Sequence, residues 1–433
     1  MSEKADRLIV PTPESSQASP SIASLSLKVL ISTGDALLAQ RRLGVAKLLF
    51  QEALKRKPWS NRALAGLGRV YNEKLVPDRA LLCLSKLSVY RPDFPRAAAG
   101  CARAFSSLGD YRSAEKWFER ATIVEPSMRG HSVALGVTKL RLGKWQEGWA
   151  LYDLREGRET LIQTLGHDRV WDGSGDIDGK RVLVVGEQGF GDHIHFMRYC
   201  RLLKERGAYV IFLTRPEIQR LASWLPEIDE VVTNQDKTRF DYAVMAMSLP
   251  RLFSTTPESI PLRQPYLSPP KRQSERETER SPFKIAIAWK GNPDNSRDAV
   301  RSCPAYLMAE LVREFEHVEF TGLPFDLAAE KDPDLAAITP LCGEHADFAG
   351  VAEALGEIDL VISVDTSLAH LAAAIGKPTW ILIGHHPDWR WLVHGADSLW
   401  YESMRLFRID SDWSELIQRV KKELSLHLPA GLR

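Results

Sequence analysis

Hydrophobic positions follow two different patterns along the chain, and the change comes near residue 178. Beyond that point, short runs rich in β-branched residues alternate with helical stretches, as in residues 181–185 and 209–213. Strands that alternate with helices are typical of parallel sheets covered on both faces. Before residue 178 the apolar positions repeat with a longer period. The pattern therefore predicts a helical front part and an α/β rear part.

The rear part divides again at residues 266–282, where adjacent prolines and mixed charges indicate a linker. We expect a Rossmann-like lobe over residues 178–265, a second one over 283–425, and a last helix from Trp413. Loops at the carboxyl ends of two doubly wound sheets face one another, so the ligand site is predicted in the cleft between the lobes. The strand-like runs are 181–185, 209–213, 230–232 and 242–244 in the first lobe, and 284–289, 318–321, 359–363 and 379–383 in the second.

Three prolines in the front part lie thirty-four residues apart, at Pro58, Pro92 and Pro126. Small and bulky residues repeat with the same step. A small residue lets two antiparallel helices approach, a bulky one four positions later fills the groove, and the proline ends the second helix. The co-phased sets are Ala46, Ala80 and Ala114; Phe50, Leu84, Phe118 and Tyr152; Ala53, Leu87 and Ala121; and Gly34, Gly68 and Gly136.

This pattern resembles the tetratricopeptide repeat. The alternative is a generic helical bundle. Three units fit residues 27–126, and a fourth, 127–160, is degenerate because Gly148 replaces the alanine. We expect a repeat domain over residues 26–160 behind a mobile Pro- and Ser-rich tail over 1–25. Stacked repeats form an extended surface, so their expected role is to hold a protein or peptide.

Composition excludes several classes of protein. With 44% hydrophobic and 26% charged residues the chain resembles an ordinary globular protein, and a net charge of +1 makes nucleic acid a poor candidate partner. The five cysteines are odd in number and scattered, which fits neither a disulfide framework nor a zinc site. We find no signal-peptide pattern and no long apolar run, so we expect a cytoplasmic protein without a transmembrane segment.

One segment of the second lobe, residues 363–370, joins the end of a buried strand to a helix that begins with hydroxyl-bearing residues. A helix start of this kind offers free N–H groups and the positive end of the helix dipole to a phosphate. The alternative is that Asp365 or Thr366 only caps the helix. Further cations follow the first strand of the same lobe, and they would either neutralise phosphates or remain solvated: Lys290, Arg297 and Arg301.

The first lobe carries a loop with the spacing G-x-x-G-x-G, from Gly186 to Gly191, followed by Asp192. This spacing is not the dinucleotide fingerprint, which argues against an NAD enzyme. The alternative to a functional loop is a glycine-rich turn with a capped helix. His193 and His195 lie two positions apart and cannot share a helical face, so a metal pair is not expected there, nor at the adjacent His385 and His386.

Both segments resemble motifs of the bacterial heptosyltransferases, over roughly residues 178–425. The resemblance implies a GT-B architecture of two Rossmann-like lobes, with Asp192 as the general base. It assigns the donor diphosphate to a set of second-lobe residues, namely Asp365, Thr366, Ser367, Leu368, His370, Arg301 and Lys290. The acceptor side would include Gly189, Gly191 and His195. Relatives that carry repeats have a small residue at the position of Lys290, which makes Arg301 the better candidate.

The same resemblance predicts a glycosyltransferase that needs no metal and no cofactor, with a nucleotide sugar as donor substrate. The repeats would present a protein acceptor, and relatives of this architecture include enzymes that modify flagellin. Two alternatives are a transferase that acts on lipopolysaccharide or another glycan, and a non-catalytic scaffold with a retired transferase fold. The intact Asp192 and residues 365–370 argue against the scaffold. The aromatic segments 387–392 and 400–408 are predicted to be buried at the lobe interface, rather than to stack a base.

Overall fold

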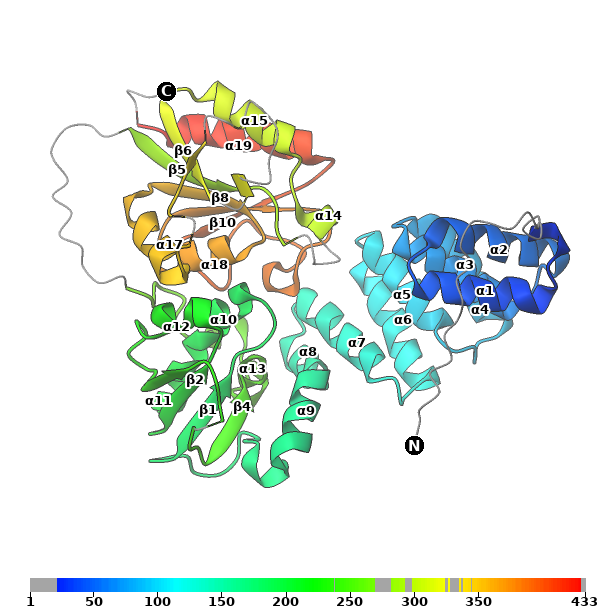
Figure 1. Cartoon of the computed structure of the whole chain (residues 1–433), viewed down its shortest axis with the longest axis horizontal. Helices are drawn as coiled ribbons and strands as arrows, with labels where there is room; N and C mark the ends of the chain where they lie inside the picture. The colour runs from blue at the N-terminus through cyan, green and yellow to red at the C-terminus, as the bar shows by residue number, and fades with distance from the viewer. Residues whose placement is uncertain are drawn as a thin grey trace, which may run out of the picture. The chain divides into compact units, whose positions relative to one another are not determined.

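The computed structural model describes residues 22–236, 238–268, 282–292, 298–323, 326–327, 335, 338–343 and 345–429 (Figure 1). The chain divides into two compact units, Met1–Ala104 and Phe105–Arg433. Of the expected tail, residues 1–21 lie outside the described residues, and Ile22–Ser24 forms a 3-10 helix, η1. Most of the expected linker also lies outside them. Its first residues are not linker in character, because Tyr266 and Leu267 are buried and their N–H groups bond to the carbonyl of Ala374.

The first unit consists of antiparallel helices that pack as the period predicts. Phe50 is fully buried between two glycines, and a Cβ at Gly34 or Gly66 would lie 2.9 or 2.3 Å from its ring. Leu84 fits against Gly68 and Gly100 in the same way. Each second helix ends two residues before its proline. The helices are α1 (Leu27–Ala39), α2 (Leu43–Arg56), α3 (Asn61–Glu73), α4 (Pro77–Tyr90) and α5 (Ala97–Ser107), which runs into the second unit.

The later helices of the array belong to the second unit. They are α6 (Tyr111–Val124), α7 (Arg129–Arg141), α8 (Trp145–Tyr152) and α9 (Glu156–Leu165). The structural division therefore falls earlier than the expected end of the repeat domain at residue 160. The reason is that Trp145, Trp149 and Tyr152 share one hydrophobic core with the α/β part. Gly148 allows the fourth pair to close, since a Cβ there would lie 2.7 Å from Leu140.

The first sheet of the α/β part is parallel and has the order β3-β2-β1-β4. Its strands are β1 (Arg181–Val185), β2 (Tyr209–Leu213), β3 (Glu230–Val232) and β4 (Tyr242–Met245), and its helices are α10 (Phe190–Phe196), α11 (Cys200–Lys204), α12 (Pro216–Ala222) and α13 (Leu249–Leu252). The strand order reverses direction at β1, which lies between β2 and β4. Ligands of open α/β sheets bind at such switch points. The loop after β1 is the one that leads to Asp192.

The second sheet is also parallel, with the order β10-β9-β8-β5-β6-β7. Its switch point lies between β5 and β8, and the segments that follow these strands hold Lys290 and residues 365–370. The strands are β5 (Phe283–Ala288), β6 (Val318–Gly322), β7 (Thr339–Pro340), β8 (Leu360–Val364), β9 (Thr379–Ile383) and β10 (Met404–Arg408). The helices are α14 (Asp298–Arg301), α15 (Ala305–Glu314), α17 (Phe348–Ala354), α18 (Ser367–Ala374) and α19 (Trp413–His427).

The aromatic residues after β9 are buried, as predicted. Trp389, Trp391, Trp400 and Tyr401 are at most 3% exposed and join the core that also contains the first sheet. Trp145 of α8 stacks on Trp400, with ring centroids 5.2 Å apart. No helix in the described ranges has both the length and the apolar character that a bilayer span requires.

Candidate functional site

The starts of α10 and α18 lie against each other, so the two motifs predicted from the sequence meet (Figure 1). Gly191 is the point of contact. A Cβ at this position would lie 2.9 Å from Cδ2 of His370 and 3.5 Å from Cα of Ser367. The absence of a side chain at Gly191 is therefore what permits the approach.

Asp192 lies in the first turn of α10, where two different donors hold its carboxylate. Oδ2 accepts a hydrogen bond of 2.9 Å from the N–H of Gly189, and Oδ1 accepts one from the guanidinium of Arg390. The Asp192 side chain keeps 19% of its surface exposed, whereas Arg390 keeps 8%. Burial raises the pKa of Asp192 above its ordinary value, although the charge of Arg390 opposes the shift. Asp192 is thus a stronger base than a surface aspartate and remains accessible.

Two more carboxylates lie near the same guanidinium. Arg390 donates a hydrogen bond of 2.8 Å to Asp388, and its charge lowers the pKa of Asp388 against the opposing effect of burial. Burial and the charge of Asp388 raise the pKa of Asp365 to about 6. We call Asp192, Asp365, Asp388 and Arg390 the carboxylate cluster. It combines groups that follow strands of both sheets and that differ in proton affinity, an arrangement typical of active sites.

The start of α18 is not closed by the side chain at its N-cap. Thr366 has extended backbone geometry and makes no side-chain bond to the helix; its hydroxyl instead lies 2.9 Å from that of Ser363. The capping alternative is therefore wrong for Thr366, and the first N–H groups of α18 remain available to an anion. Arg301 lies at this end of β8, where its guanidinium donates one 3.0 Å bond to the carbonyl of Asp365 and another to the carboxylate of Asp298.

The other predicted cations lie elsewhere. The ammonium of Lys290 donates a hydrogen bond of 2.9 Å to the carbonyl of Asp326 and lies over the ring of Trp289. Asp326 is buried, which raises its pKa to about 7. Arg297 lies outside the described residues. Of the three candidates, Arg301 is the one whose described contacts reach the residues before α18.

The two histidines predicted to belong to the site are both buried. His195 is 0% exposed and His370 is 5% exposed, and Nδ1 of each is hydrogen-bonded to the hydroxyl of Tyr401, at 3.1 and 2.9 Å. Burial and nearby arginines lower the pKa of both rings well below the usual value. Both are therefore neutral near pH 7. The assignment of His195 to an acceptor surface does not agree with its complete burial.

No metal centre is visible in the described part of the chain, where no group of three or more His, Cys, Asp and Glu side chains could hold an ion. His193 instead bonds to the hydroxyl of Thr214 at 2.7 Å. Burial lowers the pKa of His193 to about 4.

The rear helices of the repeat array hold the glycine-rich loop, residues 186–191, a connection that the sequence did not predict. Nε of Arg155 donates a 2.8 Å bond to Glu187, and the hydroxyl of Tyr152 accepts one of 2.8 Å from Gln188. Gln188 has a φ of 62°, which is strained for a residue with a side chain. The sequence alone reveals neither the positive φ of Gln188 nor the burial of the Arg155 charge.

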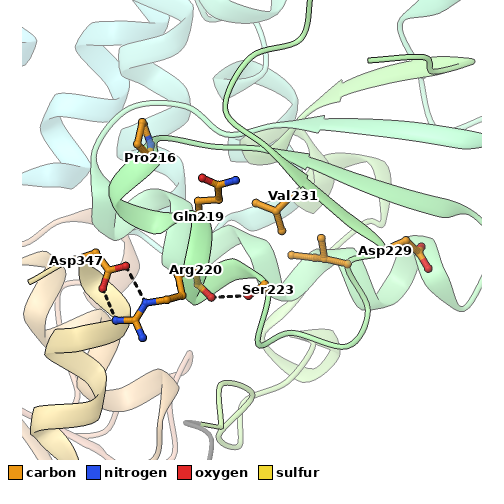
Figure 2. A pocket seen from close by; sticks show the side chains of 8 residues that line it. Pro216, Gln219, Arg220, Ser223, Asp229, Val231 and Asp347 are labelled. Atoms are coloured by element: carbon orange, nitrogen blue, oxygen red, sulfur yellow. Dashed lines mark hydrogen bonds and ion pairs between the residues drawn. The ribbon is translucent and has the colours of Figure 1, made fainter. Parts of the chain in front are cut away.

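A cavity of about 550 Å³ lies beside α12, where residues of α12 and of the β3 region line it together with Asp347, the N-cap of α17 (Figure 2). Figure 2 shows Arg220 pointing toward Asp347, with which it forms an ion pair; it also pairs with Glu353. None of the predicted site residues lines this cavity. We assign it no part in the chemistry.

Comparison with known proteins gives partial matches to both parts of the chain. Residues 327–400 match the model of glycosyltransferase family 9 (heptosyltransferase). Protein FlbA of Caulobacter vibrioides is 26% identical over 357 residues, covering 73% of this chain and 58% of that protein. Two solved structures are more distant: E. coli ADP-heptose lps heptosyltransferase II (17% identity, 57% of this chain, 98% of that chain, TM-score 0.39) and a thermophilic TPR protein of Thermus thermophilus (22%, 33%, 84%, 0.28).

These findings define the class: a tetratricopeptide-like repeat protein with a region that resembles glycosyltransferase family 9. The match includes Asp365 to His370, Asp388 and Arg390, whereas Arg301 lies before its first residue. The chain spans 58% of the length of the curated relative that it matches. What the whole chain acts on is therefore a matter of proposal.

Proposed function

We propose that the chain is a glycosyltransferase that moves a sugar from a nucleotide-sugar donor to a hydroxyl group of an acceptor. The observation that carries this proposal is the meeting of the α10 and α18 starts at Gly191. It places a carboxylate of raised pKa from one lobe close to the open helix start of the other. Transfer of a sugar needs both functions, a base for the acceptor hydroxyl and a positive site for the leaving diphosphate.

The roles follow from the contacts. N–H groups at the start of α18, at Ser367 and Leu368, would bind the diphosphate, and Arg301 would add positive charge. Asp192 would take the proton of the acceptor hydroxyl. Arg390 holds Asp192 and Asp388 in place and keeps a charge beside the cluster. In this scheme the amides and arginines stabilise the developing charge, so the transfer requires neither a metal nor a cofactor.

The repeats would present the acceptor, which we propose to be a protein, of flagellin type by analogy with relatives of the same architecture. Arg155 and Tyr152 support this proposal, because they join the last helices of the array to the loop that precedes Asp192. An acceptor held by those helices would be tied to the loop that carries the base. We expect the reaction to take place in the cytoplasm.

A thermal-shift panel of nucleotide diphosphate sugars, nucleoside diphosphates and nucleosides tests the proposal. A ligand at a hundred times its Kd stabilises the folded state by about 2.7 kcal/mol, so one diphosphate ligand should raise the Tm of Phe105–Arg433. Ser367→Leu should abolish the shift because its side chain blocks the diphosphate. Thr164→Leu, on the exposed face of α9, is the matched control. A panel in which no diphosphate ligand raises the Tm would refute the enzyme and favour a scaffold.

A further inference from the structure

A second cavity, of about 1080 Å³, lies within the unit Phe105–Arg433, and its walls come from two parts of the chain. One wall is the turn between α5 and α6, the first turns of α6, and the α7–α8 turn. The other wall is the segment that follows β9, together with the end of β10. Its principal polar residues are Arg112, Lys116, Lys144, His385, His394 and Arg408.

The wall after β9 leads directly into the carboxylate cluster. Pro387 lines the cavity, and its carbonyl accepts a 2.9 Å hydrogen bond from Nε of Arg141 on α7. The next residue, Asp388, bonds to Arg390, which in turn bonds to Asp192. A molecule in the cavity would therefore touch both the repeat helices and the segment that positions the proposed base.

The side chains that line the cavity carry a net positive charge, because the two acids among them are outnumbered by lysines and arginines. Glu115, one of the two acids in the lining, is shared by Lys139 and Lys144 at 2.8 Å. The other, Asp110, accepts the N–H of Ser113 at the start of α6.

Three further cations of the lining form no ion pair with a described carboxylate, although the charge of Lys116 helps to lower the pKa of Asp110, whose carboxylate also accepts hydrogen bonds from Ser113. Arg112 and Lys116 are exposed, lie one turn apart on α6, and form no ion pair with a described carboxylate. Arg408 donates its bonds to main-chain carbonyls, including those of Leu392 and Gly395. A ligand that supplies several carboxylates would complement these charges.

We propose that this cavity binds an acidic polypeptide segment of the acceptor protein, one that contains Asp or Glu side chains. The inference rests on the proposed function and adds a substrate class to it. Helical repeats hold extended peptides, and the volume exceeds that of an ordinary small-molecule pocket. Apart from its histidines, the lining has a single aromatic residue, Tyr111, whose ring is already covered by Arg141 at 4.6 Å.

Fluorescence anisotropy of the full chain with a labelled octaglutamate peptide tests this site, with octalysine and a Gly-Ser peptide as charge controls. Octaglutamate should bind at low salt and weaken as salt screens the charges. Arg112→Ala/Lys116→Ala should weaken it roughly tenfold, as expected for two exposed charge contacts. Lys180→Ala/Lys422→Ala removes the same charge from exposed lysines outside the cavity and should leave binding unchanged.

The inference would be overturned if octaglutamate showed no preference over the Gly-Ser peptide, or if the two double variants lost equal affinity. Displacement of the peptide by a nucleoside diphosphate would also overturn it, because the cavity would then be the donor site. Donor binding is measured separately by the nucleotide panel. A chain that binds a nucleotide sugar but no acidic peptide loses this inference alone, whereas one that binds only the peptide loses the proposed function.

Discussion

Phe50 and Tyr152 occupy the same phase of the thirty-four-residue period, yet their side chains make different kinds of contact. Phe50 is buried entirely among the apolar contacts of its own unit, between Gly34 and Gly66. Tyr152 is buried too, but its hydroxyl bonds to Gln188 in the glycine-rich loop. Repeats at the front of the array are thus self-contained, while those at the rear hold the site. The repeat period predicts both buried side chains, but it does not tell which of them contacts the glycine-rich loop.

The largest expected effect belongs to the front repeats. Phe50→Ala should cost the unit Met1–Ala104 about 3–5 kcal/mol, because it leaves a cavity between two glycine-bearing helices. Leu48→Ala, on the exposed face of α2, is the control and should cost far less. Denaturant unfolding measures the loss, and calorimetry should find an unchanged affinity for the nucleotide. A reduced nucleotide affinity would show that the front repeats are coupled to the site.

Arg155→Ala should leave the stability of the front repeats unchanged and should alter the candidate site instead. It removes the ion-pair partner of the buried Glu187, at a cost of about 3 kcal/mol to the unit Phe105–Arg433, whereas Asp153 keeps its ion pairs with Arg158 and Arg251. The unpaired charge of Glu187 should raise the pKa of Asp192 further, so the acid limb of the kcat/KM profile should move to higher pH.

Arg155→Lys should restore much of that limb, and Arg129→Ala, which breaks an exposed pair with Glu159, should leave it in place. An Arg155→Ala enzyme with the parent pH profile would mean that Arg155 is structural only. The rear helices would then differ from the front ones in packing, not in function.

Arg301→Ala should affect donor binding alone, which distinguishes the donor site from the rear repeat helices. Loss of a charge-assisted contact to the diphosphate should weaken donor binding by about 1.5–3 kcal/mol, measured by calorimetry. Arg405→Ala, which removes an exposed arginine of β10, should leave the affinity unchanged. An unchanged affinity in Arg301→Ala would place the diphosphate elsewhere.

The smallest expected effect is a difference in acid stability between the two units. The first 104 residues contain no histidine, whereas the second unit buries His193 with a pKa of about 4. An unfolded histidine titrates near pH 6.5, so the unfolded state binds the extra proton and stability is lost as pH falls from about 6.5 to about 4. The loss should approach roughly 1 kcal/mol per pH unit and be smaller in His193→Gln. Equal slopes in parent and variant would contradict the shifted pKa.

Local signals account for the parts of the fold that the sequence predicted. The period placed Phe50 and Leu84 in their grooves, and the β-branched runs at 181–185 and 209–213 coincide with β1 and β2. The start of α18 was recognisable because strand, hydroxyl residues and helix are contiguous. The roles of Arg390 and Arg155 could not be recognised in the sequence, because only the tertiary fold brings them to their partners Asp192 and Glu187. The early unit division has the same origin, in tryptophans of α8 that pack against distant strands.

The central claim is that Asp192 is the base of a sugar transfer at the meeting of α10 and α18. Its most direct test is the single-turnover rate of Asp192→Asn with the nucleotide sugar found in the panel and its protein acceptor, followed by mass spectrometry of the acceptor. Asparagine keeps the shape and caps a helix about as well, so folding and donor affinity should persist. The rate should fall by about 10²- to 10⁴-fold. A rate within a few-fold of the parent at equal donor affinity would contradict the account.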